Sequence, residues 1–213
     1  MIQAHYEVDN LFFGRALLRS IPMIEAEMTD ERQHVDPQVE FVITAPEPYG
    51  AKLAYKARAR MTLGVLTQLM SQAQQSLVIA APFLQPSEIL DRGPLAEALH
   101  SALQRGVVVD VVSTGSSFRS LGISDLLVIG HGQLRFFQPL ANVEDERRLG
   151  SHAKFCIADG KDAYIGSANL TGAGMSGNLE MGLLVHGELA HQVEQFWKYL
   201  LEAGFFVEIE VIE

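Results

Sequence analysis

A strand–helix–strand pattern between residues 77 and 112 constrains the fold of this chain more than any other feature. Residues 77–83 (Leu-Val-Ile-Ala-Ala-Pro-Phe) are typical of a buried strand, and residues 107–112 (Val-Val-Val-Asp-Val-Val) form a second, β-branched one. Between them, three leucines four residues apart lie on one face of a helix over residues 94–105, which Gly106 is placed to end. Two apolar strands joined by a helix form a parallel βαβ unit, so the pattern predicts an α/β fold.

The remaining chain continues this alternation of helices and strands. Apolar residues at helical spacing predict a long amphipathic helix over residues 52–75, ahead of the first core strand. Further strands are expected over residues 133–137, 153–158, 163–166 and 180–185, a helix over 188–202 and a closing edge strand over 205–212. We therefore expect a mixed, largely parallel central sheet flanked by helices.

The first 50 residues differ in charge from the rest of the chain. They carry three arginines against nine acidic residues and end in an apolar strand followed by a Pro/Gly-rich turn. We expect an acidic N-terminal extension over residues 1–50 and a catalytic domain over residues 51–213. Residues 51–60 then carry four basic residues and no acidic one. This basic segment either follows a phosphate backbone or forms a solvated helix face.

The composition of the chain limits the compartments and the binding partners that we expect. No segment approaches the roughly 20 apolar residues that span a bilayer, and the N-terminus lacks the pattern of a secretory signal, so no membrane insertion is expected. The single cysteine, Cys156, fits a reducing compartment and predicts a cytoplasmic protein. A net charge of −10 argues against broad attraction to nucleic acid or to anionic lipid.

A group of polar residues lies on the apolar strands of the predicted hairpin. His152 and Lys154 are two residues apart, so a strand presents both on the same face. Ser167 and Asn169 repeat this spacing after the next strand, and Glu180 opens a third. Because buried imidazole and ammonium groups without partners cost free energy, we expect a functional site. Glu180 is placed to accept a hydrogen bond from the second nitrogen of His152 and so to fix its tautomer.

The spacing of these residues resembles the HKD signature of the phospholipase D superfamily. The match consists of His152-x-Lys154-x4-Asp159, then Gly166-Ser167-x-Asn169, then Glu180. In that family the histidine attacks phosphorus and forms a covalent phosphohistidine. The resemblance implies that neither a metal nor another cofactor is needed, because a lysine and hydrogen-bond donors stabilise the charge.

The resemblance also implies a role for each residue of the signature. His152 would be the nucleophile, and Lys154 and Asn169 would hold the non-bridging phosphate oxygens. Ser167 would donate a hydrogen bond to the phosphoryl group. Asp159 and Gly166 would be structural, with Asp159 holding the hairpin.

The signature occurs once in this chain, and no second His-x-Lys is present. The family mechanism needs two histidines, the second of which protonates the leaving oxygen. Small bacterial nucleases of the superfamily assemble such a site from two chains. We therefore expect a homodimer with the active site at its two-fold axis, an arrangement that suits the commonest oligomeric symmetry.

Three functions remain open at this point. The first is a nuclease acting on DNA or RNA, the second a phospholipase D-type lipid hydrolase, and the third a non-catalytic auxiliary subunit. The order of the elements is also similar to the phospholipase D-like proteins of DISARM-type antiphage systems, which would imply a nucleic acid target and defence-system partner proteins. Ser116 and Arg119, in the loop after the second core strand, either contact a substrate phosphate or belong to a plain surface loop.

Overall fold

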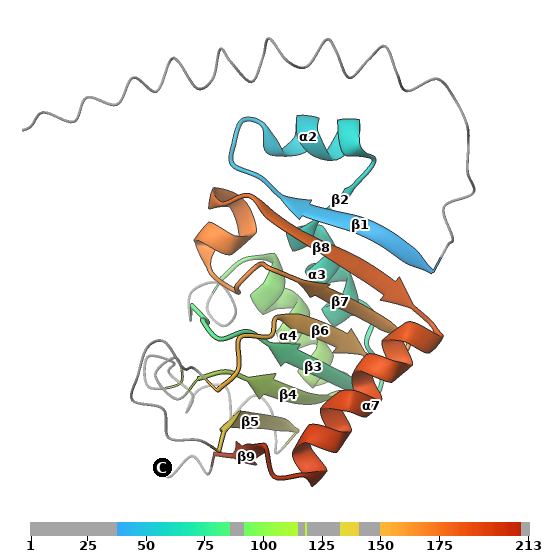
Figure 1. Cartoon of the computed structure of the whole chain (residues 1–213), viewed down its shortest axis with the longest axis vertical. Helices are drawn as coiled ribbons and strands as arrows, with labels where there is room; N and C mark the ends of the chain where they lie inside the picture. The colour runs from blue at the N-terminus through green and yellow to red at the C-terminus, as the bar shows by residue number, and fades with distance from the viewer. Residues whose placement is uncertain (1–37, 86–91, 115–117, 119–132, 141–149, 210–213) are drawn as a thin grey trace, which may run out of the picture. The chain divides into compact units, whose positions relative to one another are not determined.

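The computed structural model describes residues 38–85, 92–114, 118, 133–140 and 150–209. In this part of the chain, nine strands form a single sheet in the order β2-β1-β8-β7-β6-β3-β4-β5-β9 (Figure 1). The strands are β1 (Val39–Thr44), β2 (Arg60–Met61), β3 (Ser76–Ala80), β4 (Val108–Val112), β5 (Leu134–Pro139), β6 (Phe155–Ala158), β7 (Asp162–Gly166), β8 (Glu180–His186) and β9 (Phe206–Glu208). The helices are α2 (Gly50–Ala57), α3 (Thr62–Gln72), α4 (Pro94–Gln104), α7 (Glu188–Glu202) and the π-helix η3 (Ala173–Gly177).

The sheet is mixed, as predicted, but its parallel part is smaller than expected. Strands β3, β4 and β5 are parallel neighbours, and β1 is parallel to β2. The other five pairings are antiparallel. Antiparallel pairs dominate because β6, β7 and β8 follow one another through short connections, whereas a parallel pair needs a crossover.

Two apolar layers cover the two faces of the sheet. On one face, the buried side chains of α3 and α4, such as Leu69 and Leu99, pack on inward residues such as Ile79. On the other face, Trp197 of α7 packs among strand residues that include Ile157. Figure 1 shows α7 crossing the sheet near one end of the strands. Both faces therefore contribute to the core, which explains why β3 and β4 are mostly apolar on both faces.

The long helix expected over residues 52–75 is wrong, because two helices and a short strand occupy this segment. Helix α2 ends at Ala57. The next residue, Arg58, has a left-handed backbone (φ 51°), and β2 follows before α3 begins. A left-handed residue cannot continue a helix, so the chain turns back and β2 pairs with β1. The apolar spacing was periodic on both sides of this break, and the break itself carries neither glycine nor proline.

Strand β1 ties the region before residue 50 to the rest of the sheet. It pairs along its whole length with β8, from Val39 opposite Val185 to Thr44 opposite Glu180. The apolar strand predicted at residues 41–44 is thus confirmed, and it joins the same sheet as the strands after residue 51. Residues 1–37 lie outside the described part of the chain, so the role of the acidic extension stays a prediction.

Candidate active site

The ends of five strands meet where the predicted site residues lie. Strand β3 ends with Ala80 opposite Phe155, the first residue of β6. Strand β7 ends at Gly166, and β8 and β1 meet there as Glu180 and Thr44. His152 and Lys154 directly precede β6, so the sheet brings the two halves of the signature to the same edge.

His152 and Lys154 form the centre of this group. The Lys154 Nζ lies 3.0 Å from Nδ1 of His152 and donates a second hydrogen bond, of 2.9 Å, to the His152 carbonyl oxygen. The His152 side chain is exposed, whereas Lys154 is only 8% exposed. Burial lowers the pKa of Lys154, and the negative charge of Glu180 partly opposes this shift. The pair thus places an exposed imidazole at the surface with the amine of a buried lysine beneath it.

Glu180 is held by groups other than His152. Ser167 Oγ donates a hydrogen bond to Glu180 Oε2, and Asn178 Nδ2 donates one of 3.3 Å to Oε1. The backbone N–H of Met181 in turn donates to Ser167 Oγ at 3.1 Å. Ser167 therefore joins β8 to the end of β7 and holds the Glu180 carboxylate, whose charge acts on Lys154. The expected hydrogen bond from His152 to Glu180 is not among those recorded for the described residues.

Asn169 lies in the loop after β7, which packs against the π-helix. Its Oδ1 is buried and has no hydrogen-bond partner among the described residues. The next residue, Leu170, forms a bridge with Leu84 just beyond β3. Gly174 packs so closely on the Asn169 carbonyl oxygen that a Cβ at this position would overlap it. No sequence pattern singled out Gly174, whose missing side chain lets η3 pack against the loop that carries Asn169.

Asp159 lies at the opposite end of β6 from His152. Its two carboxylate oxygens accept hydrogen bonds of 2.8–3.2 Å from the backbone N–H groups of Gln74, Gln75 and Ser76. Burial alone would raise the pKa of Asp159, but these hydrogen bonds and Lys161 together lower it. Asp159 thus links the β6–β7 turn to the start of β3, as suits the structural role that the resemblance implied.

Two glycines at the site make room for a tyrosine that the sequence analysis did not single out. Gly166 lies opposite Gly182 on the neighbouring strand, and the ring of Tyr164 lies against both. A Cβ at Gly166 would overlap the Tyr164 hydroxyl, and one at Gly182 would lie 2.6 Å from the Tyr164 ring carbon Cε2. The glycine of the signature is therefore required for packing beneath the site.

The predicted substrate-binding residues Ser116 and Arg119 lie outside the described residues. Nearby, Ser113 and Thr114 at the end of β4 donate hydrogen bonds of 3.2 and 3.0 Å to the Pro82 carbonyl oxygen. These bonds fix the start of that loop beside the end of β3. In the described part of the chain, no three His, Cys, Asp or Glu residues are grouped as a metal site would require.

The comparison with protein families agrees with this geometry. A family model described as the cardiolipin synthase, PLD-like domain matches residues 66–201, which include the whole signature. The chain belongs to the phospholipase D-like family. The fold class predicted from the sequence is confirmed by this match and by the sheet described above.

This phospholipase D-like chain matches most of one curated relative but only a small part of another. The DISARM protein DrmC of Bacillus paralicheniformis is 25% identical over 179 residues, which is 83% of this chain and 69% of that protein. Cardiolipin synthase B of Salmonella typhi is 26% identical over 129 residues, which is 59% of this chain but 28% of the synthase.

Solved structures show the same fold. Nuc from Salmonella typhimurium, a phospholipase D family member, superposes with a TM-score of 0.54 at 18% identity, covering 81% of this chain and 98% of Nuc. NucT from Helicobacter pylori gives a TM-score of 0.56 at 19% identity, covering 81% of this chain and all of NucT. No helix in the described residues is long and apolar enough to cross a membrane.

Proposed function

We propose that this phospholipase D-family phosphodiesterase is a metal-independent nuclease that cleaves DNA or RNA through a phosphohistidine intermediate. The observation that carries the proposal is the exposed His152 imidazole held over the buried Lys154 ammonium, beside the Ser167–Glu180 pair. An exposed nucleophile next to a fixed cation suits an anionic phosphodiester. The site residues are those proposed from the sequence, and the site is shared by two copies of the chain in a homodimer.

The reaction proceeds in two balanced steps. In the first, Nε2 of His152 forms a bond to phosphorus, the P–O bond to the leaving group breaks, and His152 of the partner subunit gives that oxygen a proton. In the second, the same partner histidine takes a proton from water, the water oxygen bonds to phosphorus and the P–N bond breaks. Lys154 and Asn169 bind the non-bridging oxygens in both steps.

The free site needs a change in hydrogen bonding before the first step. While the Lys154 ammonium donates to Nδ1 of His152, the ring proton sits on Nε2, where it blocks attack. A substrate phosphate offers Lys154 a better acceptor and draws it away from the imidazole. Exchange with water then moves the ring proton from Nε2 to Nδ1, which leaves a neutral ring with a free lone pair on Nε2. Glu180, already close enough to act on the charge of Lys154, accepts the Nδ1 hydrogen bond and stabilises the positive charge that the ring gains when Nε2 bonds to phosphorus.

Nucleic acid is the favoured substrate for two reasons. The DISARM protein DrmC matches this chain over 69% of its own length, so we propose that the protein acts in antiphage defence in the cytoplasm with defence-system partner proteins. Three basic residues of the 51–60 segment, Lys52, Lys56 and Arg58, are exposed and fit a phosphate backbone. Arg60, the fourth basic residue of the segment, is half-buried and binds Glu40 and Gln68.

The test is cleavage in EDTA of single- and double-stranded DNA and RNA, beside a phosphatidylcholine assay. We expect cleavage of nucleic acid and its loss, with the fold unchanged, in His152→Ala. The matched control is His191→Ala, because His191 is an exposed histidine on α7 away from the site. Retained cleavage in His152→Ala would contradict the mechanism. Cleavage of lipid alone would identify a phospholipase, and no cleavage of either would favour the auxiliary subunit.

A further inference from the structure

Helix α2 presents two lysines and a tyrosine to solvent. Tyr55 and Lys56 follow Lys52 by three and four residues, so the three side chains lie on one face of the helix. All three are exposed, and Tyr55, at 83%, is the most exposed large apolar or aromatic residue in the described part of the chain. The two buried residues of α2, Gly50 and Ala54, lie on the opposite face. The helix therefore packs against the sheet through small residues and directs its long side chains outward.

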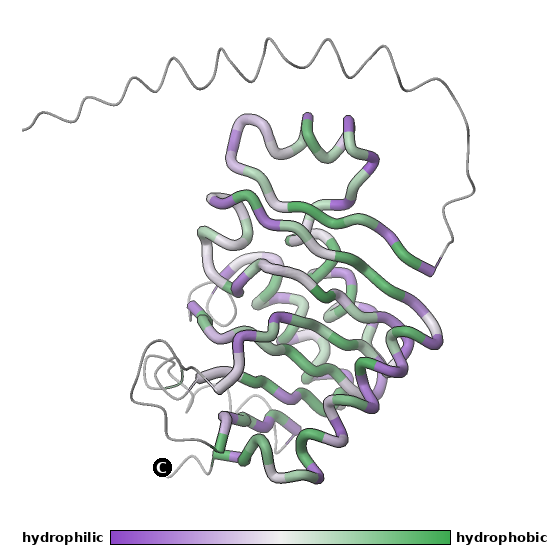
Figure 2. The backbone as a smooth tube through the Cα atoms, viewed as in Figure 1, coloured by the Kyte–Doolittle hydropathy of each residue, from purple (hydrophilic) through white to green (hydrophobic). Residues whose placement is uncertain are grey.

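This helix is cationic although the chain as a whole is acidic. The net charge is −10, yet residues 49–58 contain Lys52, Lys56 and Arg58 and no acidic residue. Figure 2 shows hydrophilic residues recurring along α2 and the turn that follows it, beside the mainly hydrophobic β1. An anionic partner is attracted to α2 and repelled by the net charge of the chain, so its binding is confined to this surface.

Helix α2 begins at the edge of the sheet that carries the proposed active site. Thr44, the last residue of β1, lies opposite Glu180, and the chain leaves β1 there before α2 runs back beside that strand (Figure 1). Gly50, the first residue of α2, packs so closely on Ala45 that a Cβ would lie 2.8 Å from the Ala45 carbonyl oxygen. Strand β6, which His152 precedes, is three strand spacings from β1, about 14 Å. A few nucleotides span this distance, because each advances a strand by about 3.4 Å or more.

The combination of side chains identifies the partner. An exposed aromatic ring stacks on an unpaired base, and lysines beside it bind the adjoining phosphates, which is how proteins hold single-stranded nucleic acid. In a duplex the bases are already stacked inside the helix, so Tyr55 would reach only the backbone. A membrane would instead need an apolar helix face, and the small residues Gly50 and Ala54 on the other side of α2 are buried.

We infer that the α2 face of Lys52, Tyr55 and Lys56 binds single-stranded nucleic acid and holds the strand whose scissile phosphate occupies the active site. This inference rests on the proposed function, because the strand on α2 is the substrate of the site. It goes further by naming the surface outside the signature that binds the substrate, and by selecting single strands over duplexes.

The first test is binding of a fluorescent oligothymidylate in EDTA, measured by anisotropy. All proteins in this test carry His152→Ala, so that the strand is not cut. We expect Tyr55→Ala to weaken binding roughly 5–150-fold, the usual effect of losing one stacked base, and Tyr55→Phe to retain it. The matched control is Tyr199→Ala, because Tyr199 is a 64% exposed tyrosine on α7. Equal binding by Tyr55→Ala and Tyr199→Ala would overturn the inference.

The same measurement with a hairpin duplex tests the preference for single strands. Tyr55→Ala should change the affinity for the duplex little, because paired bases do not stack on the ring. An equal loss of affinity for the duplex and the single strand would overturn the inference. The side chain of Tyr55 is 83% exposed, so its removal should leave the circular dichroism spectrum and the thermal unfolding unchanged.

A second test uses the salt dependence of binding to count phosphate contacts. For a single strand, each contact adds about 0.7 to the slope of the logarithm of the binding constant against that of the salt concentration. Lys52→Gln and Lys56→Gln should each lower the slope by about this amount, whereas Tyr55→Ala should leave it unchanged. The matched control is Lys161→Gln, which removes an exposed lysine in the turn between β6 and β7. Slopes that both α2 lysine variants leave unchanged would overturn the inference.

The remaining outcomes separate this inference from the proposed function. Cleavage by the wild type with unchanged binding in Tyr55→Ala would support the nuclease and overturn the role of α2. Weakened binding in Tyr55→Ala, in a protein that cleaves no nucleic acid, would support the binding surface and contradict the nuclease. Binding of the wild type to phosphatidylglycerol vesicles that is lost in Tyr55→Ala, with oligonucleotide binding unchanged, would identify α2 as a membrane contact and overturn the inference.

Discussion

Lys154 Nζ lies 3.0 Å from Nδ1 of His152, so the buried cation of the site is bound directly to the proposed nucleophile. The lysine has two roles in the mechanism: it holds the imidazole in the free enzyme and the phosphate oxygens once substrate binds. Both roles require its positive charge.

The first prediction concerns the pH dependence of cleavage. Burial lowers the pKa of Lys154, with Glu180 opposing, so the ammonium loses its proton at a pH below the roughly 10.4 of a free lysine. We therefore expect kcat/KM to fall as the pH rises, and this fall to occur below the pH of roughly 10.4 at which a free lysine loses its proton. Lys154→Met should lower kcat by roughly 10²–10³, the usual cost of one charge-stabilising donor. Lys154→Arg, whose guanidinium stays charged, should lack this alkaline fall, and the same fall in that variant would contradict the assignment.

The second prediction separates structure from catalysis at Asp159. Asp159→Asn tolerates the left-handed backbone at this residue (φ 54°) but replaces one of the two accepting oxygens by an amide nitrogen. We expect the free energy of unfolding to fall by about 1–3 kcal/mol at pH 7, while kcat of the folded enzyme stays unchanged. Urea unfolding and cleavage rates measure the two quantities.

The pH dependence of stability provides a further check on Asp159. Its pKa is lowered in the folded state, so its contribution is present above the pKa of the unfolded chain, about 3.9, and is lost as the pH falls through the folded value. The difference in stability between wild type and Asp159→Asn should therefore shrink in acid. A loss of kcat at full stability would instead place Asp159 in the chemistry.

Local patterns were sufficient to predict most of the fold. The helix expected over residues 94–105 is α4 (Pro94–Gln104), and the strand expected over 107–112 is β4 (Val108–Val112). Such segments are defined by neighbouring residues, whose apolar period shows directly in the sequence. The pairing of β1 with β8 joins residues about 140 positions apart and depends on tertiary packing. No local pattern encodes it.

The same distinction applies to the candidate site. The spacing of the signature predicted that His152 and Lys154 lie side by side, because they are two residues apart at the start of one strand. It did not predict that Glu180 binds Ser167 and Asn178, nor that the Tyr164 ring lies beneath Gly166 and Gly182. These contacts are set by side-chain packing across three strands, which the spacing of residues along the sequence does not reveal.

The third prediction tests the packing of Tyr164 beneath the site. Gly166→Ala and Gly182→Ala should each lower the free energy of unfolding by about 1–3 kcal/mol, because both overfill the same space. A Cβ at Gly166 meets the Tyr164 hydroxyl first, whereas one at Gly182 meets the ring itself. Tyr164→Phe should therefore partly restore Gly166→Ala but not Gly182→Ala. A double-mutant cycle of urea unfolding measures this difference, and equal rescue of both would contradict the placement of the ring.

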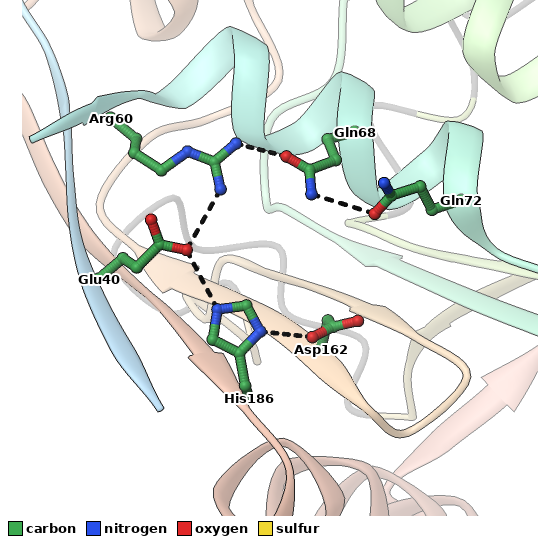
Figure 3. A network of polar contacts seen from close by, with 6 residues as sticks. All are labelled: Glu40, Arg60, Gln68, Gln72, Asp162 and His186. Carbon is green, nitrogen blue, oxygen red and sulfur yellow. Dashed lines mark hydrogen bonds and ion pairs between the residues drawn. The ribbon is translucent and has the colours of Figure 1, made fainter. Parts of the chain in front are cut away.

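The last prediction concerns a polar network at the end of the sheet opposite His152. His186 of β8 contacts Asp162 of β7 through Nδ1 at 2.5 Å and Glu40 of β1 through Nε2 at 3.2 Å (Figure 3). Arg60 binds the same Glu40 oxygen at 3.3 Å and also binds Gln68 of α3. The network thus joins the strand β1 to the two strands that carry the site residues.

Protonation of His186 should strengthen this connection. Burial alone would lower the pKa of His186, but its hydrogen bonds and the charges of Asp162 and Glu40 raise it. The resulting stability is fully present below the unfolded pKa of about 6.5 and is lost as the pH rises through the higher folded value. Both carboxylates are 39% exposed, so solvent screening limits the contribution to about 1 kcal/mol.

The measurement is urea unfolding of wild type and His186→Gln between pH 6 and pH 9. Glutamine is neutral throughout this range, so the stability difference between the two proteins should be largest at pH 6 and shrink towards pH 9. Cleavage measured at one pH should change little in His186→Gln, because His186 lies at the end of β8 far from Glu180. A stability difference that is constant with pH would show that the raised pKa of His186 does not stabilise the fold.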